Sequence, residues 1–308
     1  MLSDSTMSNM QKKSAFIVTK PLQLMVAMSL IEQLDLKAVS DFLIVDAFAN
    51  AEDVAQRLQK YSNFGRSIFC DSFKKAYRIA KKRCYQHLYI DSDVGLRQYA
   101  QLVLIKVFHR KKEINVYEEG LGTYRNDLYH GTRKYFLDLI GAGTYFGGCS
   151  LTSKFYAYRP EEYKIKLNVH YKKVEEIRKP LEQFILENID ILRDIFNFRE
   201  IEKIMNFSMF YDECHVYLSS WTIDNSIMKD INGFSGLKLL KPHPHIKNNK
   251  SNEGFLTIPA YIPAELLLIK LLEVCKKINV YHHGTSASRY INSDRIHFVN
   301  KKFNEERY

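Results

Sequence analysis

Residues 15–23, with the sequence AFIVTKPLQ, determine how the chain begins to fold. Four apolar residues lead up to Thr19, which is typical of a strand that is buried on both faces. Pro21 then stands where a helix would begin, a position at which its missing amide hydrogen costs nothing, and apolar residues recur at helical spacing to about Leu34. A strand followed at once by a helix predicts the opening βα unit of a parallel sheet.

The same alternation continues through the first half of the chain. Strands are predicted at 42–45, 67–70, 87–90 and 113–117, and helices at 51–61, 72–84 and 95–108. This spacing predicts a parallel sheet with helices on both faces. Ligands bind to such sheets beyond the carboxyl ends of the strands, where Thr19, Asp91 and Glu118 fall.

A second alternating set occupies the C-terminal third. Strands are predicted at 215–218, 237–240 and 278–281, and helices at 222–232 and 263–275. Between the two sets, 171–179 and 180–198 have long helical patterns. The apolar side of 180–198 serves either as core or as the contact of a homodimer.

We therefore expect four parts along the chain. They are a disordered leader at 1–13, an N-terminal acceptor-side domain at 14–160, a helical connection at 161–210 and a C-terminal donor-binding domain at 211–308.

Composition indicates a reducing compartment and a basic surface. The five cysteines are scattered and include no CxxC pair, which argues against both a disulfide framework and a zinc site. No stretch approaches the roughly 18 apolar residues of a membrane span. The net charge of +10 attracts anions such as nucleotides, phosphoglycans or an anionic membrane surface. We expect a cytoplasmic protein, with peripheral attachment to the inner membrane as an option, and no nucleic-acid partner because no nucleic-acid module is recognisable.

A pair of carboxylates ends the predicted strand 113–117. In the motif Tyr117-Glu118-Glu119-Gly120, a glutamate could accept a proton from an acceptor hydroxyl. Adjacent side chains of an extended chain point to opposite faces, so one carboxylate is expected to meet the cleft while the other serves the structure. Taken alone, the motif is more typical of a solvated turn before Gly120 and Gly122.

An imidazole follows the predicted strand 237–240. In Lys241-Pro242-His243-Pro244, the two prolines restrict the backbone and so present His243 rigidly. A protonated His243 could stabilise a departing phosphate, whereas the alternative is an ordinary surface loop. His245 lies two residues further on, but no third metal ligand is spaced nearby, so no metal site is predicted.

Two further segments suit a nucleotide. Residues 284–288, GTSAS, follow a strand and open a helix, where amides and hydroxyls attract phosphate, although an ordinary helix cap has the same composition. Glu265 lies in the first turn of a helix beginning at Pro263, where it either complements the helix dipole or accepts ribose hydroxyls. Neither the P-loop nor the dinucleotide-binding glycine fingerprint occurs.

Other functions are compatible with the sequence. Asp91-Ser92-Asp93 follows a strand and would suit a metal-dependent nucleotide-sugar glycosyltransferase. A non-catalytic basic binding protein would also explain the charge.

The motifs in order resemble those of bacterial sialyltransferases: Tyr117-Glu118-Glu119-Gly120, His243-Pro244, Pro263-Ala264-Glu265 and Thr285-Ser286. Residues 18–23, VTKPLQ, are similar to the first βα turn of the lipooligosaccharide sialyltransferase and polysialyltransferase families. The resemblance implies an α/β, GT-B-like fold, in which two Rossmann-like domains with parallel sheets face each other across a cleft. It also implies an inverting enzyme that moves sialic acid, or a related nonulosonic acid, from a CMP-activated donor to a hydroxyl of a surface glycan, capsule or lipooligosaccharide, without metal or other cofactor.

The resemblance also implies roles for individual residues. Glu118 matches the general base, His243 the group that assists departure of CMP, and Glu265 the acid that holds the cytidine ribose. Thr285 and Ser286 match the pair that binds the donor phosphate. On the donor side, the expected supporting residues are Lys241, Pro244 and Ser288. On the acceptor side, they are Thr19, Glu119, Gly120 and Gly122.

Two departures from the family pattern concern these roles. The base is often aspartate, and the longer glutamate would shift the acceptor. The phosphate pair here lies within GTSAS, which leaves open whether Ser288 shares the phosphate.

Overall fold

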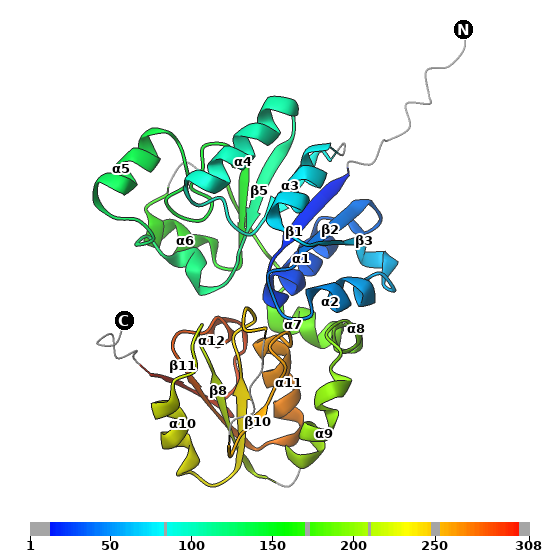
Figure 1. Cartoon of the computed structure of the whole chain (residues 1–308), viewed down its shortest axis with the longest axis vertical. Coiled ribbons are helices and arrows are strands. Elements are labelled where there is room, and N and C mark those ends of the chain that lie inside the picture. The colour runs from blue at the N-terminus through cyan, green and yellow to red at the C-terminus, as the bar shows by residue number, and fades with distance from the viewer. Residues whose placement is uncertain (1–12, 83–84, 170–172, 209–210, 248–252, 302–308) are drawn as a thin grey trace.

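The computed structural model describes residues 13–82, 85–169, 173–208, 211–247 and 253–301, so the expected leader lies outside the described residues except for Lys13. Two α/β domains are stacked one above the other, with α7 and α8 at their junction (Figure 1). The expected fold class is confirmed: both domains contain parallel sheets with helices packed against them.

The N-terminal domain is built on a sheet of seven described strands, all parallel. Their order is β3 (Arg66–Cys70), β2 (Ser40–Val45), β1 (Ser14–Val18), β4 (His87–Ile90), β5 (Glu113–Tyr117), β6 (Lys154–Ala157) and β7 (Val174–Glu176). The helices are α1 (Pro21–Gln33), α2 (Ala51–Leu58), α3 (Phe73–Lys82), α4 (Gly95–Phe108), α5 (Gly131–Leu139) and α6 (Pro160–Leu167), with short 3-10 turns η1 (Lys37–Val39), η2 (Ser62–Phe64) and η3 (Leu121–Tyr124).

The central strand β1 is buried on both faces, as its sequence predicts. Phe16 and Val18 pack on the side of α1 and α2, whereas Ala15 and Ile17 pack on the side of α3 and α4. A strand covered in this way has no polar face, which explains why it is continuously apolar.

The C-terminal domain repeats the design with a smaller sheet. Its described strands are parallel, in the order β10 (Leu256–Thr257), β9 (Leu237–Lys241), β8 (Glu213–Leu218), β11 (Lys277–His282) and β12 (Ile296–Asn300). The helices are α10 (Asn225–Asn232), α11 (Ala264–Val274) and α12 (Ala287–Tyr290).

The expected domain limit at residue 160 is wrong. Strand β7 pairs with β6, and α6 packs on the same sheet, so the N-terminal domain continues to Glu176. Of the expected helix at 171–179, residues 171 and 172 lie outside the described residues, and Val174–Glu176 form β7 instead. The helical connection consists of α7 (Leu181–Glu187), α8 (Ile189–Ile195) and α9 (Arg199–Ser208).

The helices of the connection contribute to the hydrophobic core. Phe184 and Ile185 of α7 and Leu192 of α8 are fully buried, in a cluster that runs from α1 to α11 and thereby joins the two domains. Much of the apolar side of 180–198 therefore packs the two domains together. None of the helices in the described part of the chain combines the length and apolarity needed to cross a bilayer.

Candidate functional site

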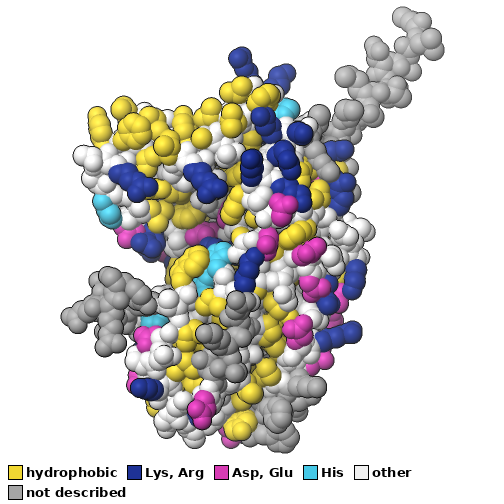
Figure 2. Space-filling view, viewed as in Figure 1, with side chains coloured by type: hydrophobic (Ala, Val, Ile, Leu, Met, Phe, Trp, Pro, Cys, Tyr) yellow, Lys and Arg dark blue, Asp and Glu magenta, His cyan; other side chains and the backbone are white. Residues whose placement is uncertain are grey.

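A pocket of about 360 Å³ lies between the two domains, at the carboxyl ends of β8, β9 and β11 on one side and of β1 and β5 on the other. Figure 2 shows the molecule hollowed between its two halves, with histidine and hydrophobic side chains in the hollow. Predicted residues from separate motifs line the pocket: Lys241, His243, Pro244, Glu265, Thr285, Ser286, Glu119 and Gly122. Glu118, Thr19, Gly120 and Ser288 are not among its lining residues.

His243 is held as a neutral imidazole with a defined tautomer. Its Nδ1 atom accepts a hydrogen bond from the amide of His245 at 3.3 Å, so the ring proton lies on Nε2. Burial lowers the pKa of His243 to about 3, and the nearby positive charge of Lys20 acts in the same direction. The ring can therefore donate an N–H to an anion, and a bound phosphate would raise its pKa.

Trp221, the only tryptophan of the chain, also lines the pocket and was missed by the sequence reasoning. Its ring stacks on His243 and on His245, with centroids 4.7 Å and 4.6 Å apart. This packing fixes both imidazoles, while the tryptophan itself is 68% exposed. Trp221 lies in the loop just beyond the end of β8 at Leu218, so the rule that ligands bind beyond strand ends could have identified it.

Beneath the C-terminal wall of the pocket, a lysine and a glutamate are both buried. The Lys241 ammonium donates to the carbonyls of Pro242 at 2.6 Å and Ala260 at 2.9 Å. Burial lowers the pKa of Lys241 to about 7 and raises that of Glu265, and the charge of each group partly offsets the effect on the other. A buried carboxyl at the pocket wall is suited to accept ribose hydroxyls.

The hydroxyls of the GTSAS segment divide into two groups. Thr285 and Ser286 line the pocket, and the Ser286 hydroxyl donates to Glu265 at 3.2 Å. Ser288 instead donates to the carbonyl of Thr285 at 2.9 Å and closes the turn. Ser288 is thus not among the lining residues, and the hydroxyls of this segment that line the pocket are those of Thr285 and Ser286.

Glu118 is placed away from the pocket, contrary to expectation. It is fully buried and accepts hydrogen bonds from the hydroxyls of Tyr124 at 2.7 Å and Tyr290 and from the amide of Tyr158 at 2.8 Å. Burial raises its pKa, while these donors act in the opposite direction. Because Tyr290 belongs to α12, Glu118 ties the N-terminal sheet to the C-terminal domain.

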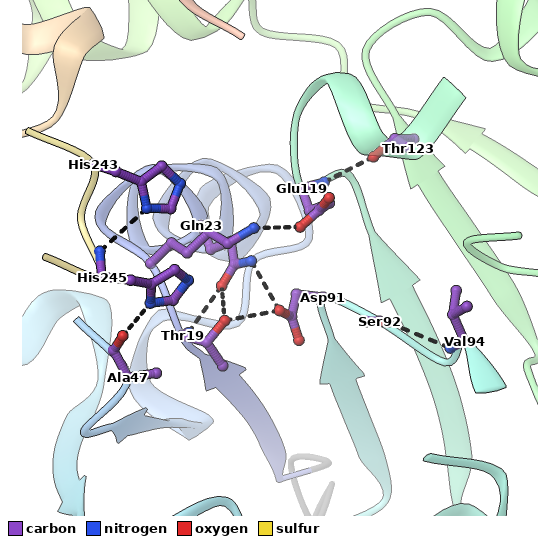
Figure 3. A network of polar contacts seen from close by, with 11 residues as sticks. Thr19, Gln23, Ala47, Asp91, Ser92, Val94, Glu119, Thr123, His243 and His245 are labelled. Carbon is purple, nitrogen blue, oxygen red and sulfur yellow. Dashed lines mark hydrogen bonds and ion pairs between the residues drawn. The ribbon is translucent and has the colours of Figure 1, made fainter. Parts of the chain in front are cut away.

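Glu119 is the carboxylate that faces the pocket. Its Oε2 atom forms an ion pair with the Lys20 ammonium at 2.7 Å, and its backbone amide donates to the Thr123 hydroxyl at 3.0 Å (Figure 3). A Cβ atom at Gly122 would overlap Glu119 Oε1, so only glycine leaves room for the carboxylate in this position. As the alternation of an extended chain predicts, one carboxylate meets the pocket and the other is buried in the structure. The one that meets the pocket is Glu119, and the buried one is Glu118.

Gly120 lets the two domains approach closely. Its φ of +122° lies in the region that favours glycine, and a Cβ atom there would stand 3.0 Å from Cβ of Ser286. The turn that contains Glu119 and Gly120 therefore lies directly against Ser286 of the GTSAS segment.

Thr19 belongs to a buried network below the pocket. Its hydroxyl donates to Asp91 at 2.9 Å, and its amide donates to the Gln23 side chain at 2.8 Å, which in turn donates to Asp91 (Figure 3). The network fixes the first βα turn and with it the position of Lys20.

Asp91 and Asp93 are not arranged as a metal-binding pair. Asp93 is fully buried and accepts hydrogen bonds from the amides of Gly147 and Cys149 and from the Thr152 hydroxyl at 2.6 Å. Its carboxylate holds a loop of the N-terminal domain, while Asp91 accepts hydrogen bonds from the side chains of Thr19 and Gln23. Within the described residues, no group of three or more His, Cys, Asp or Glu side chains could hold a metal ion.

The architecture matches a known enzyme fold. A structural match, with a TM-score of 0.52 and 12% sequence identity over 94% of this chain and 88% of that one, is the crystal structure of UDP-GlcNAc 2-epimerase from Neisseria meningitidis bound to UDP-GlcNAc. The chain has a GT-B-like fold. No protein-family model matches the sequence, and no curated protein matches it. At this identity the likeness concerns the fold alone, so the GT-B-like domains account for the pocket's place but not for its substrate.

Proposed function

We propose that the protein is an inverting, metal-independent glycosyltransferase that moves sialic acid or a related nonulosonic acid from a CMP-activated donor to a hydroxyl of a surface glycan, in capsule or lipooligosaccharide. The observation that carries the proposal is the convergence of motifs from distant segments on one interdomain pocket. Glu119 comes from the N-terminal domain, and His243, Glu265 and Ser286 come from the C-terminal domain.

The two walls of the pocket suit the two halves of such a reaction. The C-terminal wall offers an imidazole N–H, two hydroxyls and a buried carboxyl, which fit a leaving phosphate and a ribose. The N-terminal wall offers the Glu119 carboxylate, which fits an acceptor hydroxyl. In this proposal the N-terminal domain is the acceptor side, the C-terminal domain is the donor side, and Glu119 takes the place of Glu118 as the base.

The reaction follows from these positions. Glu119 takes the proton of the acceptor hydroxyl as the acceptor oxygen forms a bond to the anomeric carbon of the donor sugar. The bond from that carbon to the CMP phosphate oxygen breaks on the opposite face, which inverts the configuration. His243 donates its Nε2 proton in a hydrogen bond to the phosphate, with Thr285 and Ser286 as further donors, and CMP leaves with the bonding electrons.

Lys20 moderates the base. Its ion pair with Glu119 at 2.7 Å orients the carboxylate before the acceptor binds. The same ammonium lies close enough to lower the pKa of His243 and would attract a phosphate to this end of the pocket.

The direct test combines two measurements. One is a titration with CMP, in which binding is monitored through the fluorescence of Trp221. The other is a transfer assay that measures CMP release from a CMP-nonulosonate in the presence of EDTA. We expect CMP to bind more tightly than UDP or UDP-GlcNAc and turnover to persist in EDTA. Preference for a UDP-sugar, as the structurally similar epimerase would suggest, would overturn the CMP assignment. Salt-dependent binding of phosphate polymers without any turnover would support a basic binding protein instead.

We place this reaction in the cytoplasm. Cys70, Cys149, Cys214 and Cys275 are buried thiols, which is typical of a reducing compartment, whereas Cys84 lies outside the described residues.

A further inference from the structure

An apolar surface covers the outer side of α4 and α5 in the N-terminal domain. Its side chains are between 45% and 72% exposed, and they are Leu96, Leu104, Val107 and Phe108 of α4 with Tyr135, Phe136 and Leu139 of α5. We call these seven residues the α4–α5 surface. Figure 2 shows hydrophobic side chains gathered over the part of the molecule where Figure 1 places these helices. So many large exposed apolar groups together are unusual for a surface that faces only water.

Backbone contacts bring the start of α4 next to the segment that follows α5. The amide of Gly95, at the start of α4, donates to the carbonyl of Gly143 at 2.8 Å, just beyond the end of α5. Val94 and Gly143 form a parallel bridge at the same point. The outward residues Leu96, Leu104 and Val107 recur at helical spacing, so α4 turns one apolar side outward although its opposite side is packed in the core.

Basic side chains border the apolar ones. The segment 95–112 contains no acidic residue, and exposed cations stand at both ends of α4 and at the start of α5, namely Arg97, Arg110, Lys111 and Arg133. The Lys81 ammonium lies over the Phe108 ring at 3.6 Å, and the Arg133 guanidinium lies over the Tyr129 ring at 4.9 Å. Such side chains can keep their apolar stems against the rings while the charged ends reach outward.

We propose that the α4–α5 surface docks the protein on an anionic lipid bilayer. Apolar side chains enter the boundary between headgroups and acyl chains, and the surrounding cations meet the lipid phosphates. A second copy of the chain fits this surface less well, because a two-fold contact would bring Arg97, Arg110, Lys111 and Arg133 of both copies together. The proposal extends the inner-membrane expectation, which rested on charge alone, to a particular surface, and it does not depend on the proposed transfer reaction.

Sedimentation of the full chain with lipid vesicles tests the proposal. Vesicles of phosphatidylglycerol and phosphatidylcholine should bind the protein, and vesicles of phosphatidylcholine alone should bind it at least about tenfold more weakly. The double variant Leu104→Asp with Leu139→Asp should lose binding to the anionic vesicles by at least about tenfold. Leu186→Asp is the matched control, because Leu186 is 55% exposed on α7 and lies outside this surface.

A second variant keeps the test valid if the first fails to fold. Arg110→Glu with Lys111→Glu changes only exposed charges and should weaken binding to anionic vesicles by about tenfold or more, with a normal thermal melt. Three results would overturn the proposal: no binding of the wild-type chain to anionic vesicles, wild-type binding by the folded double variants, or a wild-type dimer in analytical ultracentrifugation that Leu104→Asp with Leu139→Asp converts to monomer.

Discussion

Replacing Glu119 by glutamine removes a base without removing volume. The substitution leaves the shape of the pocket intact and takes away the negative charge that pairs with Lys20 at 2.7 Å. General bases contribute about 10² to 10⁴ in rate, so kcat should fall by that factor, equivalent to about 3–5 kcal/mol of transition-state stabilisation. CMP affinity should be unchanged or slightly tighter, because a negative charge near a bound phosphate has been removed.

Glu118→Gln is the matched control, since it makes the same chemical change one residue earlier. Glu118 accepts from Tyr124, Tyr158 and Tyr290, and glutamine replaces charge-assisted hydrogen bonds with neutral ones. We expect the free energy of unfolding to fall by about 1–3 kcal/mol and turnover by less than about tenfold.

The assay combines CMP release at saturating donor, calorimetry with CMP and a urea melt of each variant. The reasoning fails if Glu119→Gln retains turnover within about tenfold of the wild type. It also fails if Glu118→Gln loses about 10² or more in turnover with an unchanged melt, because the buried carboxylate would then be the base.

Four further outcomes follow from the geometry. Gly122→Ala should push the Glu119 carboxylate aside, lowering kcat with little change in the melting temperature, and unchanged kcat would show that this position is not needed. Ser286→Ala should weaken CMP binding by about tenfold or more in calorimetry, as expected for losing a hydrogen bond to a charged group, and unaltered affinity would remove Ser286 from the phosphate site. The pKa of His243 is about 3 in the folded protein and ordinarily 6.5, so between these pH values the unfolded chain binds a proton that the folded chain does not. The free energy of unfolding should therefore fall as pH drops from 6.5 to 3. His243→Gln should flatten that fall in urea melts, and an equally steep fall in the variant would contradict the prediction. The pKa of Lys241 is about 7 in the folded protein and ordinarily 10.5, so the free energy of unfolding should increase as pH rises from 7 to 10.5. Lys241→Met should abolish this increase. An increase of the same size in the variant would show that Lys241 is not its source.

Local sequence predicted the elements whose signal is strong. The apolar run of β1 and the proline that begins α1 act within a few residues, so the opening βα unit could be predicted with its bounds nearly correct. The strand β7 was missed because its three residues, VEE, lie at the edge of the sheet and carry no apolar pattern. Its place depends on pairing with β6, which the segment itself does not encode.

The candidate site was predicted by type of residue and only partly by position. Strand ends and proline-flanked loops indicated His243, Glu265 and Ser286, all of which line the pocket. Sequence order could not tell which of two adjacent glutamates faces the pocket, because that depends on how the strand is rotated against Tyr124 and Tyr290.

The sequence by itself determined the alternating elements, the two parallel sheets and the strand ends at which functional groups gather, because these follow from short-range periodicity and backbone restrictions. Only the tertiary structure decided that Glu119 and His243 share one pocket, that Trp221 packs on His243, and that Asp93 is buried against the distant loop that contains Gly147. These outcomes depend on contacts between segments far apart in the chain, where burial and hydrogen bonding select one arrangement among several that the local sequence allows equally well.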